Sequence, residues 1–362
     1  MMAKFATLGT LIVVLGVVVP YAGGQTCSAP PLGLVSWWTG DGTTLDFLGQ
    51  NNGLATSQVS FAAGEVADGF SLNGTQYLQV TRSASLEPAT VSVDAWVNAT
   101  APGPGKYILS KGGTADIAAS YGLYTGMSAA GGLQFYVYDG TGPTSYHLSP
   151  DAGGAVWDGN WHHVAGTYDG SAVHLFVDGK EVGTATPTTA AIAYGLSDTN
   201  DLFIGDYNPN CASCVQHHFT GKIDEVQVFQ RALAASDVAS VFAAGQAGEC
   251  LPVQIKVGLN LIDILDLLLT GRLDVDILGS PAFNTSSVAQ STMLISPAPT
   301  GLVAKEKITC ISQDVNGDKI SDLVCLFPIN VLQLIQKPTV LVDGQVSVPG
   351  GTRTFYGVET LH

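Results

Sequence analysis

The sequence predicts an all-β protein built from two domains. Glycine accounts for 43 of the 362 residues and charged residues for only 12%, a composition typical of short strands joined by tight turns. Turns such as "YDGTG", "WDGN" and "VDGK" recur along residues 27–250 and separate short apolar runs. Because the chain is much longer than the roughly 150 residues usual for one domain, we expect two compact units.

The charge balance and the N-terminus indicate an exported protein. Asp and Glu number 30 against 14 Lys and Arg, giving a formal net charge of -16, which disfavours nucleic acid and anionic membrane surfaces as partners. Lys4 precedes an apolar run and small residues lie around Gly24, so residues 1–24 are predicted to be a signal peptide. After cleavage we expect no membrane span, and an uncleaved anchor is the alternative.

The six cysteines of an exported chain are expected to form disulfides. Their positions predict three pairs: Cys27 with Cys250, Cys211 with Cys214, and Cys310 with Cys325. The spacing of Cys211, Cys214 and His217 or His218 would also suit zinc, which stays open as an alternative to the second pair.

Residues 27–250 are predicted to form a sandwich of antiparallel strands. Runs such as "VHLFVDG" and "IDEVQVFQ" alternate apolar and polar residues with period two, as half-buried strands do. "SAVHLFVDGKEVGTA" places an Asp-Gly turn between two such runs, which predicts a hairpin. The helical exception is the segment 232–245.

Five motifs in this region resemble, in the same order, the laminin-G-like, concanavalin A-like jelly-roll domains of secreted bacterial proteins. They are "LVSWWTGDGTTLDFLGQNNG", "FAAGEVADGFSLNGTQYLQV", "VSVDAWVNA", "WHHVAGTYDGSAVHLFVDGKEVG" and "FTGKIDEVQVFQRALAASDVASVFAAGQAGEC". The resemblance implies a jelly roll of two sheets. Domains of this kind usually serve as binding or adhesion modules, often for glycans, and some carry calcium at the rim.

Aromatic and imidazole side chains of this domain have two interpretations each. Stacking on sugar rings is one role for tryptophan, but at strand positions we expect core packing instead; the residues concerned are Trp37, Trp38, Trp96 and Trp161. His162 and His163 are adjacent on a strand and so point to opposite faces, which favours packing over a shared metal.

The carboxylates of this domain do not predict catalysis. Glycan hydrolysis on such a fold requires paired carboxylates, as in the Glu-x-Asp-x-x-Glu motif of glucanases, and the chain lacks that motif. We therefore predict no catalytic residues. Asp46, Asp224 and Glu225 are instead candidates for a second calcium site at the rim.

Residues 251–362 are predicted to form a smaller β-sandwich. The composition shifts toward Leu and Ile; "LNLIDILDLLL" suggests a short helix over 260–269, and "RLDVDILGS" alternates as a strand does. The region resembles a C-terminal β-domain that recurs in secreted bacterial proteins. Its members carry an Asp-x-Asn-Gly-Asp-Gly-x-x-Asp loop followed by an apolar strand.

The stretch "QDVNGDKISD" predicts a calcium loop in this domain. Its oxygen donors fall on alternate positions, as a hard cation requires: Asp314, Asn316, Asp318, the backbone carbonyl of Ile320, and Asp322. Lys319 stands where glycine is usual, and Cys325 replaces the bidentate glutamate of an EF-hand, so we expect a different loop of modest affinity. A solvated acidic turn is the alternative.

Together these observations predict a secreted, non-catalytic, calcium-stabilised protein that binds a glycan or another extracellular polymer. The alternative is a structural or adhesion protein of the cell surface that contacts other proteins. A glycan-active enzyme is disfavoured because the carboxylate pair is missing.

Overall fold

The structure is a computed structural model of the chain. It describes residues 27–55, 59–113, 118–128, 131–195, 200–208, 217–258, 267–296, 308–329, 334 and 339–361. The predicted signal peptide lies outside these residues. Within them, no helix is long and apolar enough to cross a membrane.

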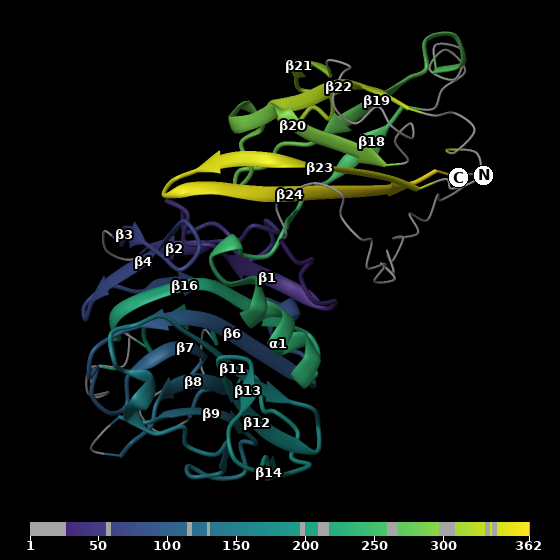
Figure 1. The fold of residues 1–362 in the computed structure, drawn as a ribbon. Helices are drawn as coiled ribbons and strands as arrows, with labels where there is room; N and C mark the ends of the chain where they lie inside the picture. The colour runs from purple at the N-terminus through teal and green to yellow at the C-terminus, as the bar shows by residue number, and fades with distance from the viewer. Residues whose placement is uncertain are drawn as a thin grey trace, which may run out of the picture.

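The first domain is a sandwich of two antiparallel sheets, as the sequence predicts (Figure 1). The nine-stranded sheet contains β1 (Leu34–Trp38), β3 (Ser60–Ala63), β4 (Asp68–Asn73), β6 (Val91–Asn98), β11 (His162–Tyr168), β12 (Ala172–Val177), β13 (Lys180–Glu181), β14 (Thr186–Pro187) and β16 (Thr220–Phe229). The seven-stranded sheet contains β2 (Gly53–Ala55), β5 (Leu78–Val80), β7 (Tyr107–Lys111), β8 (Tyr121–Thr125), β9 (Leu133–Tyr138), β10 (Tyr146–Leu148) and β15 (Leu202–Ile204). Side chains from the facing surfaces of both sheets form one hydrophobic core.

Local sequence signals explain the connections of this domain. The predicted hairpin joins β12 to β13, and its turn residues Asp178 and Gly179 both have positive φ, 49° and 72°, as a type I′ turn requires. The predicted helix is present as α1 (Ala235–Ala244). Single 3₁₀ turns occur at η1 (Ala84–Leu86), η2 (Gly154–Val156), η3 (Gly245–Ala247) and η4 (Thr285–Ser287).

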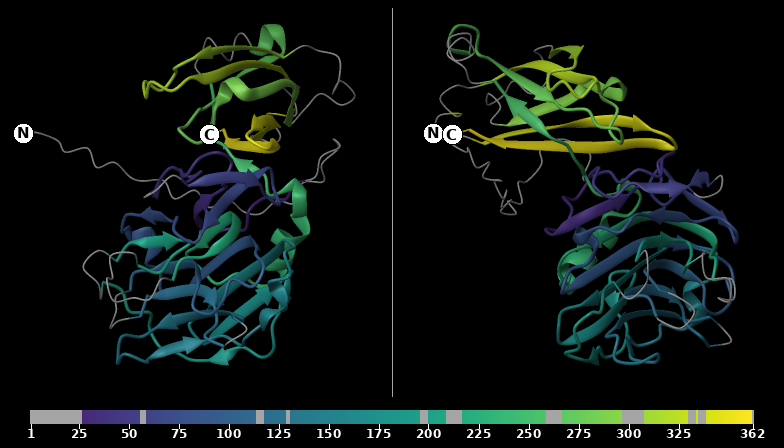
Figure 2. Two further views of the ribbon diagram at one scale, coloured as in Figure 1. Left: turned by 90° about the vertical axis from the view of Figure 1, so that its left-hand side faces the viewer. Right: turned by 180° about the vertical axis from the view of Figure 1, so that it is seen from behind.

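The second domain consists of two four-stranded sheets that pack on each other (Figure 2). One contains β17 (Leu251–Pro252), β20 (Val288–Ser296), β23 (Thr339–Val348) and β24 (Gly351–Thr360). The other contains β18 (Ile255–Val257), β19 (Arg272–Ile277), β21 (Thr309–Gln313) and β22 (Asp322–Pro328). Of the helix predicted at 260–269, residues 267–269 are described and are helical, and 260–266 lie outside the described residues.

Two of the three predicted disulfides are confirmed. Cys27 is bonded to Cys250 and Cys310 to Cys325. The first closes the start of the first domain onto its end, directly before β17. The second joins the paired strands β21 and β22 at the ends of the "QDVNGDKISD" loop. Cys211 and Cys214 lie outside the described residues.

The two domains share a hydrophobic core at their junction. Trp37 and Phe47 of the first domain pack with the core of the second, and ring contacts continue from Phe47 through Phe283 to Phe355 with centroids 6.3 and 5.4 Å apart. Aromatic side chains of the first domain are therefore part of the same hydrophobic core as Phe355 of β24.

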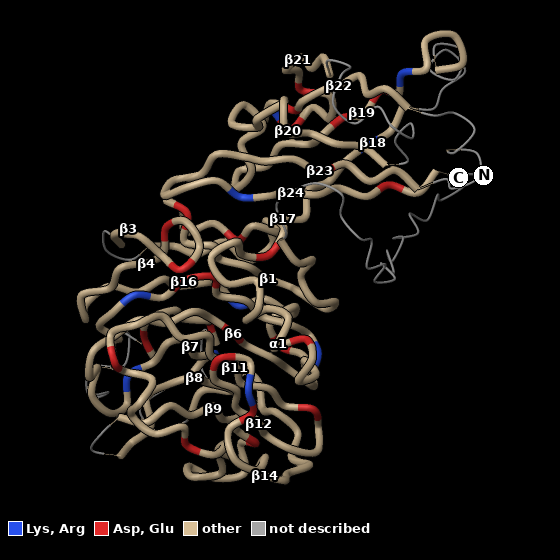
Figure 3. Tube along the Cα trace, viewed as in Figure 1, with Lys and Arg blue, Asp and Glu red and all other residues tan. Residues whose placement is uncertain are grey.

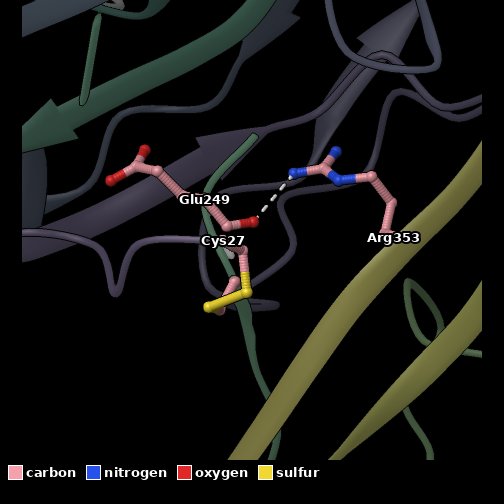
Figure 4. Close-up of a disulfide and its surroundings, with 4 residues drawn as sticks. Cys27, Glu249 and Arg353 are labelled. Carbon is pink, nitrogen blue, oxygen red and sulfur yellow. Dashed lines mark hydrogen bonds between the residues drawn. A yellow bond between two sulfur atoms is a disulfide. The ribbon is translucent and has the colours of Figure 1, made fainter. Parts of the chain in front are cut away.

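A buried arginine also crosses the junction. Arg353 of β24 is fully buried and pairs with Asp41 at 3.0 Å and Glu225 at 2.8 Å, both from the first domain. Its guanidinium also donates to the backbone carbonyl of Glu249, next to the disulfide of Cys27, while the Glu249 side chain points away from it (Figure 4). Arg353 thus fastens the second domain to the point where the chain leaves the first.

Candidate functional site

Tyrosine side chains cover the outer face of the seven-stranded sheet. In β8 and β9 the inward residues Leu123, Phe135 and Val137 join the core, and alternate residues point outward because side chains alternate along a strand. The outward set and its neighbours are Tyr107, Tyr124, Tyr136, Tyr138, Tyr207 and Tyr146, which we call the tyrosine face.

The rings of the tyrosine face pack closely on one another. Tyr107 lies with its ring centroid 5.1 Å from Tyr124 and 4.8 Å from Tyr207, and its hydroxyl is 3.2 Å from that of Tyr136. Gly122 lies beneath them: a Cβ there would come within 2.9 Å of the Tyr136 ring. The absence of a side chain at Gly122 therefore leaves the space that the Tyr136 and Tyr107 rings occupy.

One edge of the tyrosine face is open to solvent. Tyr146 is 42% exposed and its ring packs against Tyr136 at 6.0 Å. Met127 is 70% exposed and lies, like the half-buried His217, beside Gly105. Nδ1 of His217 donates to the carbonyl of Gly105. An exposed ring backed by buried rings is a rigid apolar platform.

Polar groups border this platform. The Tyr124 hydroxyl donates to Gln134 Oε1 at 3.5 Å, and Gln134 Nε2 donates to the carbonyl of Ser149 at 3.3 Å. The exposed Asp151 lies beside them. Burial, reinforced by Tyr146 and Asp151, raises the pKa of Tyr124 above its usual value, so its phenol stays neutral. The face offers neutral rings and hydroxyls, one amide and one carboxylate.

Comparisons with known proteins place the first domain in a family. Residues 72–239 match a family model described as the concanavalin A-like lectin/glucanases superfamily. The first domain is a concanavalin A-like domain. A comparison with curated proteins returned no match.

Several solved structures are similar to the chain. Domain 4 of an extracellular arabinanase from Geobacillus stearothermophilus, in complex with arabinotriose, is 17% identical, covers 59% of this chain and 98% of its own, and has a TM-score of 0.46. A structure of botulinum neurotoxin type C, described with two ganglioside molecules, is 10% identical. It covers 89% of this chain and 84% of its own, with a TM-score of 0.44. A Trypanosoma rangeli sialidase is 18% identical, covers 62% of this chain and 35% of its own, and has a TM-score of 0.43.

The tryptophans of the concanavalin A-like domain are mostly core residues. Trp37, Trp38 and Trp96 are buried, which agrees with core packing instead of sugar stacking. Trp161 is half-buried, and the amine of Lys222 lies 6.0 Å from its ring centroid. Tyr146, in contrast, reaches the surface beside a packed ring cluster, and no pattern in the sequence marks it out.

His162 and His163 point to opposite faces, as predicted. His162 lies between Asp178 at 2.9 Å and Asp158 at 3.3 Å; burial lowers its pKa, but the two carboxylates raise it more, so the pKa lies above its ordinary value. His163 is buried 3.8 Å from Asp94. For zinc, only His217 and His218 are described, because Cys211 and Cys214 lie outside the described residues.

The candidates for a second calcium site have other partners. Asp46 is buried and accepts backbone N–H bonds from Trp37 at 2.8 Å and Asn51 at 2.9 Å, so it organises the loop after β1. Asp224 accepts from the backbone of Val66, and Glu225 pairs with Arg353. Over the described residues no three acidic, histidine or cysteine side chains gather as a metal site.

The predicted calcium loop is folded around its own side chains. Asp314 accepts backbone N–H bonds from Gly317 at 2.7 Å and Lys319 at 3.0 Å. Lys319 has φ 71°, the left-handed conformation for which glycine is usual. The lysine therefore adopts the turn that glycine makes in the related loops.

The remaining donors of the loop have different surroundings. Asn316 and Asp318 are exposed; Asp318 accepts from the backbone N–H of Ile320 at 2.8 Å. Asp322 is fully buried and accepts from two backbone N–H groups. Each carboxylate oxygen has two acceptor sites, so one hydrogen bond per oxygen leaves room for a cation. An ion would have to draw these oxygens together.

The tyrosine face and Arg353 were missed for physical reasons. In "LQFYVY" both faces of the strand carry apolar or aromatic residues, so the period-two signal that separates core from surface disappears. Arg353 lies in "GTRTFYGVET", an alternating strand in which an arginine is expected to face solvent. Only the packing of the second domain against the first buries it.

Proposed function

We propose that this chain is an exported, non-catalytic binding protein whose concanavalin A-like domain holds a glycan or another extracellular polymer at the tyrosine face. The observation that carries the proposal is the exposed ring of Tyr146 packed against the buried ring of Tyr136. Gln134 and Asp151 lie on the same face near Tyr124. A flat apolar ring suits the C–H face of a sugar, and an amide with a carboxylate suits its hydroxyls.

The charges of the domain favour a neutral ligand over an anionic one. The chain carries a net charge of -16, and acidic positions are spread over both domains (Figure 3). Asp139, Asp151 and His147 lie on the strands and loops around the platform, with His147 bonded to Asp139 at 2.9 Å. An anionic polymer would be repelled at this edge.

A glycan array with the full chain, followed by calorimetric titration of the best ligand, tests the proposal. We expect Tyr146→Ala to weaken binding at least about tenfold, the loss of roughly 1.4 kcal/mol. Leu54→Ala is the matched control, because Leu54 is an exposed apolar residue at the opposite edge of the same sheet. Binding that Tyr146→Ala leaves intact contradicts the site, and an array without any hit favours an adhesion role toward proteins.

We also propose that the loop of Asp314, Asn316, Asp318 and the Ile320 carbonyl binds calcium as a stabilising ion. The support is the alternation of oxygen donors and the left-handed Lys319, which gives the loop its sharp turn. Asp322 would act mainly as the anchor of the loop, since it is fully buried and holds the backbone N–H groups of Gly279 and Val315.

A further inference from the structure

Lys111 is a lysine enclosed in the concanavalin A-like domain. It is the last residue of β7 and is fully buried. Its partners on the neighbouring strands are Tyr121 and Leu202, which belong to the hydrophobic core. Lysine is almost never fully buried, because removing an ammonium from water costs several kcal/mol. Contacts of the Lys111 ammonium group with its immediate partners must therefore offset this cost.

Lys111 has two partners that also contact each other. Oε1 of Glu87 lies 3.1 Å from Lys111 Nζ and accepts from the side-chain amide nitrogen of Asn200 at 2.7 Å. Lys111 Nζ donates in addition to the backbone carbonyl of Asn200. Oε1 of Glu87 therefore contacts both the Lys111 amine and the Asn200 carboxamide. The Lys111 amine also contacts the backbone of Asn200.

The surroundings hold these three groups in place. Asn200 is buried and has φ 49°, a left-handed conformation that asparagine adopts more readily than most residues with a side chain. Arg82 binds Glu87 through two nitrogens, at 2.9 and 3.1 Å, so the carboxylate is fixed from outside. On the inner side, the Tyr121 hydroxyl donates to the carbonyl of Leu86, the last residue of η1, and this contact closes the site toward the core.

We propose that Lys111 and Asn200 join through an intramolecular amide bond, with Glu87 as the proton-transfer group. The Lys111 Nζ lone pair attacks Cγ of Asn200, and the N–C bond forms. The Cγ–Nδ2 bond breaks, and Nδ2 leaves as ammonia. Glu87 takes the proton that Nζ loses and delivers it to Nδ2, so the step needs no oxidant, cofactor or second substrate.

The ionisation of the two groups agrees with this chemistry. Burial lowers the pKa of Lys111, although Glu87 opposes the shift, and a less basic amine is more easily deprotonated to its nucleophilic form. Burial alone would raise the pKa of Glu87, but hydrogen bonds from Arg82 and Lys111 lower it below its ordinary value. Glu87 is thus available as a carboxylate base.

The bond would close the sandwich at one of its central seams. Lys111 of β7 pairs with Leu202, the first residue of β15. Asn200 precedes β15 by two residues and so lies next to this end of β7. An amide between Lys111 and Asn200 makes a covalent connection between β7 and the segment leading into β15. Unlike a disulfide, that connection persists under reducing conditions.

Mass spectrometry of the purified full chain, reduced and alkylated, tests the proposal. The crosslinked chain weighs less than its sequence by one ammonia molecule. Trypsin does not cleave after an acylated lysine, so residues 107–111 are absent as a free peptide and residues 107–180 appear joined to residues 181–222 through Lys111 and Asn200. Recovery of the free 107–111 peptide in full yield overturns the proposal and leaves an ordinary buried ion pair.

Variants separate the role of Glu87 from that of the fold. We expect Glu87→Gln and Asn200→Ala to restore the full mass and the free 107–111 peptide. Glu181→Gln, which removes an exposed carboxylate of the same domain, is the control and keeps the crosslink. If Glu87→Gln does not fold, the peptide map of the unaltered chain still decides. A crosslink that forms normally in a folded Glu87→Gln variant refutes the role of Glu87.

Discussion

At the scale of single residues, Arg353 joins the two domains through buried charge pairs. It is fully buried, its guanidinium lies 5.5 Å from the centre of the Trp37 ring, and it pairs with Asp41 and Glu225 across the junction. Burial disfavours its charge, but Glu225 and Asp41 hold its pKa above the ordinary value. Arg353 therefore stays a cation among buried carboxylates.

Arg353→Met should destabilise the protein strongly. Removing one partner of a buried ion pair leaves the other charge uncompensated, at a cost of about 3–5 kcal/mol. Arg231→Met is the matched control, because Arg231 pairs with Asp237 at the same 2.8 Å but on the surface, with side chains 35% and 29% exposed. We expect that control to lose less than about 1 kcal/mol from the pair. Urea unfolding measures both, and equal losses would show that Arg353 is not a fastener.

Gly122→Ala should disturb the tyrosine face without touching the core. The new methyl group would lie 2.9 Å from the Tyr136 ring and 3.0 Å from the Tyr107 ring, and such overpacking typically costs about 1–3 kcal/mol. Gly142→Ala is the control, since nothing lies within 4 Å of a Cβ there. Thermal melting and the near-ultraviolet tyrosine signal should change in the first variant and not in the second.

At the scale of elements, the sequence predicted what depends on neighbours along the chain. The Asp-Gly hairpin at Asp178, helix α1 and the Cys310–Cys325 staple all follow from spacing within a short segment. The tyrosine face and the partners of Lys111 depend instead on residues far apart in sequence. Glu87, Lys111 and Asn200 come from three separate segments, and no local pattern relates them.

The calcium loop is an element whose oxygen donors all come from one short segment, residues 314–322. If the loop binds calcium, the ion stabilises the folded state in proportion to its occupancy, so the melting temperature should rise with added calcium and fall with a chelator. Asp314→Ala should abolish this dependence. Glu359→Gln in β24 of the same domain is the control and should keep it. A calcium response that survives Asp314→Ala would exclude this loop as the site.

At the scale of the whole molecule, the junction contains more carboxyl groups than cations. Asp41, Asp224, Glu225 and Glu249 are all buried near Arg353. Burial raises the pKa of Asp224 and of Glu249 well above their usual values. A single guanidinium cannot balance four carboxylates, so protons must remain on part of the cluster when the domains are packed together.

The stability of the packed molecule should therefore fall as the pH rises toward neutrality. Burial raises the pKa of Asp41 from 3.8 to about 6 and that of Glu225 from 4.5 to about 7, although Arg353 opposes both shifts. Between the ordinary and the raised values the folded chain binds more protons than the unfolded chain, so stability is greatest below the ordinary values and is lost as pH passes through the raised ones.

Thermal unfolding from about pH 5 to about pH 8 checks this expectation. The melting temperature of the unaltered chain should decrease over the interval, and that of Glu225→Gln should decrease less, because glutamine cannot take up the proton. Glu359→Gln removes a carboxylate of β24 that lies outside the junction and should leave the slope as it is. The difference between the Glu225→Gln and unaltered curves isolates the junction from His162, whose raised pKa gives a slope of the same sign. A melting temperature that rises across this interval, or equal slopes in both chains, would mean that these carboxyls do not hold protons in the folded state.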